Sequence, residues 1–155
     1  MQEIPSRHGR ALRELMATFD ELERPWALTG STSFALQGVP LEPDDIDVQT
    51  DRVGALEMGR LLSEHSHTPI SQHTSDSVRS WFGRFELAGV EIEIIGDLER
   101  RVGETWVGPI DVSDHLTTVD WEGLEVPVLE LSYEAEAYAQ LGRSDRARLL
   151  SEHAE

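Results

Sequence analysis

Two aspartates separated by a single residue, Asp45 and Asp47, are the first candidates for chemistry in this sequence. They lie in the segment from Asp45 to Thr50, where polar residues alternate with the inward-facing Ile46 and Val48. Such alternation predicts a β-strand, in which residues two apart share one face and are about 6.6 Å apart. Two carboxylates this close repel each other unless a cation lies between them, and oxygen ligands suit Mg²⁺. The spacing therefore predicts a hard-cation site on this strand.

A glycine-serine pair, Gly30-Ser31, stands upstream of the aspartates. It follows a short apolar run over 26–29 that predicts a buried strand, and it opens a predicted helix over 31–37 whose first turn Ser31 could cap. A glycine turn at the start of a helix offers backbone N–H groups and the positive end of a dipole to an anion. An anion site next to a Mg²⁺ site indicates nucleotide binding.

A third acidic residue is available on a later predicted strand, Val90-Glu91-Ile92-Glu93-Ile94. Both glutamates face away from the two isoleucines, so the pattern leaves Glu91 and Glu93 as alternatives.

These motifs, taken in order, resemble the nucleotidyltransferase superfamily with its polymerase-beta-like fold. The resemblance implies that Gly30 and Ser31 hold the triphosphate, and that Asp45 and Asp47 bind two divalent metals. A third carboxylate would complete the metal site and activate the attacking hydroxyl. The superfamily pattern at this point is a glycine, two residues, an aliphatic residue and the acid, which favours Glu93 over Glu91.

The resemblance is strongest to small stand-alone prokaryotic nucleotidyltransferase-like proteins and covers most of the chain. The shared segments are Thr-Gly-Ser at 29–31, Gly-Val-Pro at 38–40, Asp-Ile-Asp-x-Gln-Thr-Asp at 45–51 and Glu-Ile-x-Gly-Asp at 93–97. Two features depart from the family: the spacer between Ser31 and Asp45 is long, and Gln140 stands where related enzymes often carry a basic residue facing phosphate. Arg143 or Arg146 could replace that charge, and we expect Arg143 to bind the nucleotide.

The resemblance implies Mg²⁺-dependent transfer of a nucleoside monophosphate from an NTP to a hydroxyl on a small molecule or a protein. Two Mg²⁺ ions, or Mn²⁺, would be held by Asp45, Asp47 and Glu93. The alternative is a non-catalytic, antitoxin-like module that keeps the fold and acts through a protein partner.

The predicted elements alternate helices and strands, which indicates a single α/β domain over residues 1–155 with a mixed sheet. We expect helices over 6–23 and 52–65, a loop or edge strand over 66–76, and a hairpin of strands 78–88 and 90–95. A charged segment over 97–101 follows. A second hairpin over 117–121 and 124–128 and two helices over 132–141 and 145–153 complete the chain.

The composition limits the possible partners and cellular compartments of the protein. The chain has 155 residues, 30 acidic and 13 basic, no cysteine, and a formal net charge of -17. All basic residues are arginine, and the absence of lysine and the acidic excess suggest a high-salt or GC-biased host. The charge makes a nucleic-acid partner unlikely. With no cysteine, no signal-like N-terminus and no long apolar run, we expect a cytoplasmic protein that does not contact a membrane.

Three histidines, His65, His67 and His73, lie close together in the sequence and could bind a transition metal. No cysteine joins them and no apolar framework fixes them, so we expect surface histidines.

Overall fold

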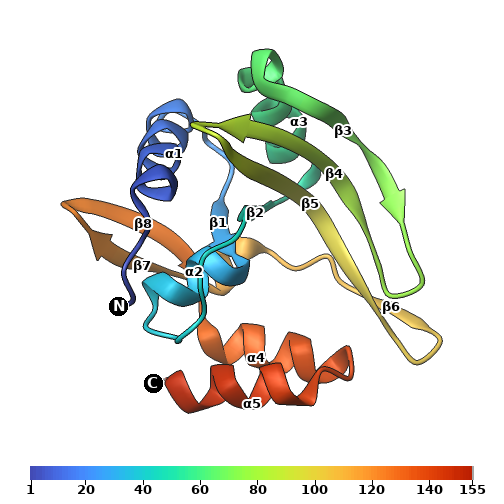
Figure 1. Cartoon of the computed structure of the whole chain (residues 1–155). Coiled ribbons are helices and arrows are strands. Elements are labelled where there is room, and N and C mark those ends of the chain that lie inside the picture. The colour runs from blue at the N-terminus through green and yellow to red at the C-terminus, as the bar shows by residue number, and fades with distance from the viewer. Residues whose placement is uncertain (155) are drawn as a thin grey trace.

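The computed structural model describes residues 1–154 as a mixed sheet with helices packed against it (Figure 1). In chain order the helices are α1 (Ser6–Thr18), α2 (Gly30–Leu36), α3 (Arg52–Leu61), α4 (Leu131–Gln140) and α5 (Ser144–His153). The strands are β1 (Trp26–Thr29), β2 (Ile46–Thr50), β3 (Ser66–Thr74), β4 (Val78–Leu87), β5 (Val90–Val102), β6 (Thr105–Val107), β7 (Leu116–Trp121) and β8 (Leu124–Leu129). Two short 3-10 turns lie at Ser63–His65 and Val112–Asp114. The architecture confirms the predicted α/β class.

The strands follow the order β3-β4-β5-β2-β1-β8-β7, and β6 pairs with β5. Two neighbouring pairs are parallel, β2 with β5 and β1 with β8, whereas the other pairs are antiparallel. The short strands β1 and β2 therefore lie in the middle of the sheet, next to β5. This arrangement brings segments far apart in the sequence to one place.

Helices α1 and α3 cover one face of the sheet. The apolar side chains of the strands, including Ile46, Val48, Ile92 and Ile94, pack there against Leu12 of α1 and Met58 of α3 in one buried cluster. A second cluster joins α2 to the C-terminal helix pair through Phe34, Leu131, Ala135 and Leu150. In Figure 1, α4 and α5 lie side by side at the bottom of the view, well away from α1 and α3. Polar residues that alternate with the apolar ones on β2 thus face the side where α4 lies.

Both predicted hairpins are present. Ala88 and Gly89 connect β4 to β5, Glu122 and Gly123 connect β7 to β8, and all four residues have positive φ. Two consecutive residues with positive φ form the two-residue turns that match the twist of antiparallel strands.

Several boundaries differ from the prediction. Helix α1 ends at Thr18 rather than residue 23, because the chain turns over 19–22 so that Leu22 and Trp26 contact the core. Helix α2 begins at Gly30, one residue early, and Ser31 does not cap it. Helix α3 ends at Leu61, before a 3-10 turn, and the segment 66–74 is an edge strand.

The charged segment 97–101 is part of β5, which runs on to Val102, and β6 was not predicted. Opposite charges on neighbouring strands explain this: Arg79 Nε of β4 donates to Glu99 Oε2 of β5 over 2.7 Å. Arg79 also lies over the Trp106 ring of β6, with its guanidinium carbon 4.4 Å from the ring centroid. Charged side chains that pair across strands are compatible with a sheet, although their sequence has no apolar alternation.

No helix within residues 1–154 is long and apolar enough to span a membrane.

Candidate active site

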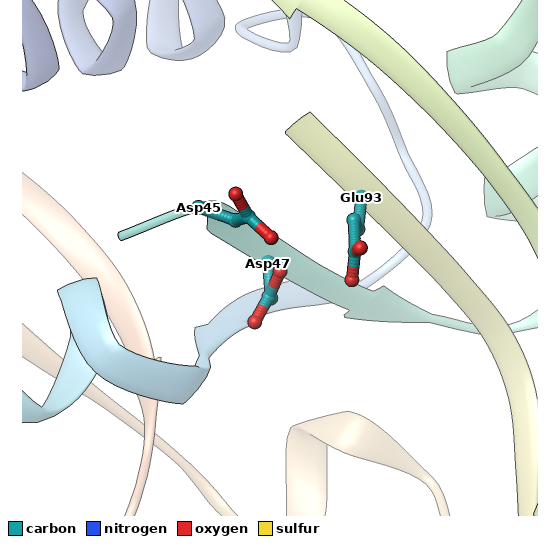
Figure 2. Close-up of side chains that lie close together, drawn as sticks. All are labelled: Asp45, Asp47 and Glu93. Carbon is teal, nitrogen blue, oxygen red and sulfur yellow. The ribbon is translucent and has the colours of Figure 1, made fainter. Parts of the chain in front are cut away.

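Three carboxylates from two neighbouring strands meet on the polar side of the sheet (Figure 2). In the parallel pairing of β2 with β5, Asp47 lies directly opposite Glu93. Asp45 lies just before β2, two residues from Asp47 and on the same side. One oxygen of each carboxylate lies within 4.8 Å of the others, and all three side chains are half-buried. The structure thus brings together the three residues that the sequence indicated as metal ligands.

Glu91 lies at the edge of this cluster. Its charge, after burial and the charge of Asp44, contributes to raising the pKa of Asp45. The cluster of carboxylates within mutual reach of one ion nevertheless contains Glu93 and not Glu91. The geometry therefore favours Glu93 over Glu91 as the third ligand, in agreement with the family pattern.

The cluster carries more negative charge than its surroundings compensate. Burial, followed by the charges of Glu93 and Asp45, raises the pKa of Asp47 to about 8. The Oδ1 atom of Asp47 is buried and has no hydrogen-bond partner among the described residues. A buried carboxylate oxygen without a donor is costly unless it is protonated or coordinates a cation. The donor set therefore fits a hard divalent cation.

One cation of the chain approaches the cluster from the side. Arg84 of β4 lies opposite Glu93, and its Nε is 3.4 Å from Glu93 Oε1 and 3.8 Å from Glu91 Oε1. Its side chain is about half exposed, so it compensates only part of the charge.

The side chain of Asp47 packs directly against the turn at Gly30. Gly30 has φ of +75°, and a Cβ atom at this position would lie 2.3 Å from Asp47 Oδ2. Only glycine permits both this backbone conformation and this close approach.

The two residues after Gly30 hold the loop that carries Asp45. The Ser31 hydroxyl accepts a hydrogen bond from the Asp44 N–H over 2.9 Å, and Thr32 Oγ1 donates to the Asp45 carbonyl over 2.9 Å. The Gly-Ser turn therefore positions the carboxylates, in addition to any role with a ligand.

A cavity of about 200 Å³ lies between the central strands and α4, and Asp47 is the member of the carboxylate cluster that lines it. Gly30 and Gln49 line it beside Asp47, and Arg100 of β5 lines it as well. Gln49 was predicted to face outward, and it does leave the core face and line this cavity, but only 4% of it is exposed. On the side of α4 the lining residues are Tyr133, Glu134, Ala137, Tyr138, Leu141 and, just beyond the helix, Arg143.

Arg143, which the sequence suggested as a nucleotide-binding residue, lines this cavity, and its guanidinium carbon is 4.9 Å from the centroid of the Tyr138 ring. Arg146 lies farther from the same ring, at 5.9 Å, and is absent from the lining.

Glu134 was not identified from the sequence, although it connects α4 to the Gly-Ser turn. Both of its carboxylate oxygens accept from the Thr29 hydroxyl at 2.8 Å, and the Gly30 N–H donates to it as well. Burial raises the pKa of Glu134 to about 7, against these hydrogen bonds and Arg100, which lower it. The available signal was its position between Leu131, Ala135 and Tyr138 on the apolar side of the helix.

The structure predicts a pH-dependent stability that originates from Glu134. Its carboxyl has a pKa near 7 in the folded protein and near 4.5 in the unfolded chain, so the unfolded state binds fewer protons between these values. The folded state must therefore lose stability as the pH rises through this window. Glu134→Gln cannot titrate. Relative to this variant, we expect the wild type to lose on the order of 2 kcal/mol of unfolding free energy between about pH 5 and about pH 8. Urea unfolding of both proteins in EDTA, at several pH values, measures this difference in unfolding free energy.

The matched control is Glu136→Gln, an exposed acid on the same helix. It should parallel the wild type at every pH. Equal pH slopes for the wild type and Glu134→Gln would contradict the assignment.

The three histidines lie apart from this site. His65, His67 and His73 are exposed, and the carboxylate cluster is the one group with metal-binding geometry found among residues 1–154.

Comparison with known proteins supports the nucleotidyltransferase assignment. The sequence profile of the aminoglycoside-2''-adenylyltransferase family matches residues 11–155. A candidate nucleotidyltransferase from Thermotoga maritima is 38% identical, with a TM-score of 0.87 over 97% of this chain and 94% of that one. No curated protein gives a significant match.

Two more distant structures share the fold. The lincosamide antibiotic adenylyltransferase LnuA, bound to lincomycin, has a TM-score of 0.55 at 12% identity over 97% of this chain and 98% of that one. The enzyme ANT(2")-Ia, in complex with adenylyl-2"-tobramycin, has a TM-score of 0.53 at 11% identity over 90% of this chain and 84% of that one. The matches over nearly the whole chain lead to one conclusion: this protein belongs to the aminoglycoside-2''-adenylyltransferase family of nucleotidyltransferases.

Proposed function

We propose that this chain is a Mg²⁺-dependent nucleotidyltransferase that moves a nucleoside monophosphate from an NTP to a hydroxyl of a small molecule. The supporting observation is the convergence of Asp45, Asp47 and Glu93 within 4.8 Å, beside the Gly30 turn and next to a cavity that Gly30 and Asp47 line. The buried, unpartnered Oδ1 of Asp47 is an additional reason to expect a cation there.

In the proposed reaction Asp45, Asp47 and Glu93 would hold the metal ions and orient the acceptor hydroxyl. Bound Mg²⁺ would lower the pKa of the acceptor hydroxyl and neutralise the leaving pyrophosphate. The hydroxyl oxygen forms a bond to the α-phosphorus, and the bond from that phosphorus to the α,β-bridging oxygen breaks. Pyrophosphate leaves with the electron pair of the broken bond, and the hydroxyl proton passes to a carboxylate oxygen of Glu93.

The nucleotide would occupy the cavity between the central strands and α4. Gly30 and Ser31 would lie next to its phosphates, since they border the carboxylates, and Arg143 would provide positive charge from the other wall. Tyr138, beneath Arg143, contributes an aromatic surface to the same cavity.

The acceptor is proposed to be a small molecule with a cationic group. LnuA binds lincomycin and ANT(2")-Ia carries an adenylylated tobramycin, so small acceptors are known from proteins of this fold. Here Asp44 and Glu91 add negative charge beside Asp45 and raise its pKa. This charge favours a cationic acceptor over an anionic one.

The test is nucleotidyl transfer by the purified protein. ATP, GTP, CTP and UTP are each incubated with Mg²⁺ or Mn²⁺ and with tobramycin, lincomycin or a small-molecule extract, at low and high salt. We expect metal-dependent pyrophosphate release together with an acceptor that gains the mass of one nucleoside monophosphate. EDTA should abolish both signals. Absence of both in every combination, with a protein partner that co-purifies stably, would instead favour a non-catalytic module.

A further inference from the structure

Arg100 of β5 is a buried cation in the wall of the cavity that Asp47 also lines. Only 7% of its surface is exposed. Its Nε and Nη2 donate to Gln140 Oε1 at 3.3 and 2.9 Å, and its Nη1 donates to the Tyr133 hydroxyl at 2.9 Å. Two neutral acceptors on α4 therefore fix the orientation of the guanidinium.

Arg100 has no carboxylate partner. None of the ion pairs found among residues 1–154 includes it. Glu134, the buried acid of the same cavity, directs its oxygens to Thr29 and Gly30 instead. A guanidinium is always charged in proteins, and a buried charge is costly unless an opposite charge accompanies it. The folded chain thus keeps a positive charge without an ion-pair partner in the wall of the cavity, and only the longer-range attraction of Glu134 offsets it.

The wall of the cavity carries charges of both signs. Asp47, where the carboxylates would hold metal ions, lines it together with Arg100 and Arg143. Tyr133 and Gln140 keep the guanidinium in place without neutralising it. A ligand that chelates divalent metal and carries further anionic groups matches this lining. A nucleobase, which is uncharged, would not compensate Arg100.

We propose that Arg100 is the principal receptor for the β- and γ-phosphates of the NTP, and that Gln140 and Tyr133 are positioning residues that hold its guanidinium without an ion-pair partner. This inference rests on the proposed nucleotidyltransferase function. It places on β5 a phosphate-binding charge that the sequence led us to expect only from the residues after α4.

The first test compares the binding of ATP, ADP and AMP in the presence of Mg²⁺. In Arg100→Gln we expect the affinity for ATP to fall about 10- to 100-fold, as for the loss of hydrogen bonds to a charged group. The affinity for AMP, which lacks the β- and γ-phosphates, should change little. Arg101→Gln is the matched control, because this adjacent arginine is exposed and bonds only to the Gly103 carbonyl among the described residues. Mn²⁺ binding without nucleotide, followed by EPR, reports whether the carboxylate site is intact.

A second variant covers the case in which Arg100→Gln does not fold. Gln140→Glu is nearly isosteric and would give Arg100 an ion-pair partner inside the protein. We expect this variant to unfold at higher urea concentration than the wild type and yet to bind ATP at least about 10-fold more weakly, with AMP binding retained. A purely structural role of Arg100 would give greater stability without the selective loss of ATP affinity.

The outcomes separate the two proposals. Wild-type protein that binds Mg²⁺-ATP, with Arg100→Gln or Gln140→Glu losing ATP affinity selectively, supports the inference. Wild-type binding with both variants unchanged, or with equal losses for ATP and AMP, overturns the inference and leaves the proposed function standing. A wild type that binds Mn²⁺ but none of the four NTPs overturns the proposed function and the inference with it.

Discussion

Asp47→Asn is expected to abolish nucleotidyl transfer and, at the same time, to stabilise the metal-free protein. Asparagine has the same shape but no charge, so it cannot bridge divalent ions as a carboxylate does. Loss of several kcal/mol of metal-dependent transition-state stabilisation corresponds to a fall in kcat of at least about 1,000-fold. The stability gain follows from the pKa of Asp47, which is raised to about 8 in the folded protein from 3.8. Without metal, ionisation of this buried group destabilises the folded state increasingly as the pH rises through that range.

Two measurements on the same preparation test this prediction. Pyrophosphate release gives the turnover, and urea unfolding in EDTA at a pH above 8 gives the stability. Asp44→Asn is the matched control, since it removes one charge from an exposed neighbour that lies outside the carboxylate cluster. Normal turnover in Asp47→Asn would refute the assignment of the site, and a variant that is both inactive and less stable would indicate a structural role instead.

Glu93→Gln is expected to impair transfer far more than Glu91→Gln. Glu93 lies opposite Asp47 in the β2–β5 pairing and belongs to the cluster, whereas Glu91 is at its edge. Loss of a metal ligand and proton acceptor should lower kcat by at least about 100-fold. Glu91 lies outside the cluster and acts on Asp45 through its charge and a side-chain hydrogen bond, so we expect less than about a 10-fold change for Glu91→Gln.

Each of these two variants is the control for the other, because they remove the same charge from the same face of one strand. The measurement is kcat at saturating NTP, together with Mn²⁺ affinity in the absence of nucleotide. Weaker Mn²⁺ binding should accompany the loss of kcat in Glu93→Gln. The reverse order of effects would transfer the role of third ligand to Glu91.

The sequence sufficed to predict those parts of the site that depend on strand periodicity. Alternation around Ile46 and around Ile92 placed the acidic residues on the face opposite the core, and both isoleucines are fully buried. Gly30 was recognisable because it ends an apolar run. What periodicity could not decide was the choice between Glu91 and Glu93, because both lie on the same face. That choice depends on the register between β2 and β5, which is a tertiary property.

The opposite wall of the cavity could not be predicted from the sequence. Glu134 is one of 30 acidic residues, and its position on the apolar side of α4 distinguishes it from the exposed Glu136 but does not reveal its partners Thr29 and Gly30. Arg100 lies in a charged segment that was not expected to form a strand at all, and its burial results from the docking of α4 against β5. Both residues acquire their environment only when distant segments pack together, so propensity and pattern contain no information about it.

The parallel pairing of β2 with β5 has a consequence for how proteins of this design can diversify. Asp47 and Glu93 face each other because their strands are hydrogen-bonded neighbours, although α3, β3 and β4 all intervene along the chain. The relative position of the two carboxylates therefore does not depend on the length of the intervening segment. Recombination or deliberate grafting could lengthen, shorten or exchange the antiparallel pair β3–β4 and thus change the surface offered to new acceptors. The arrangement of the reacting carboxylates would stay the same.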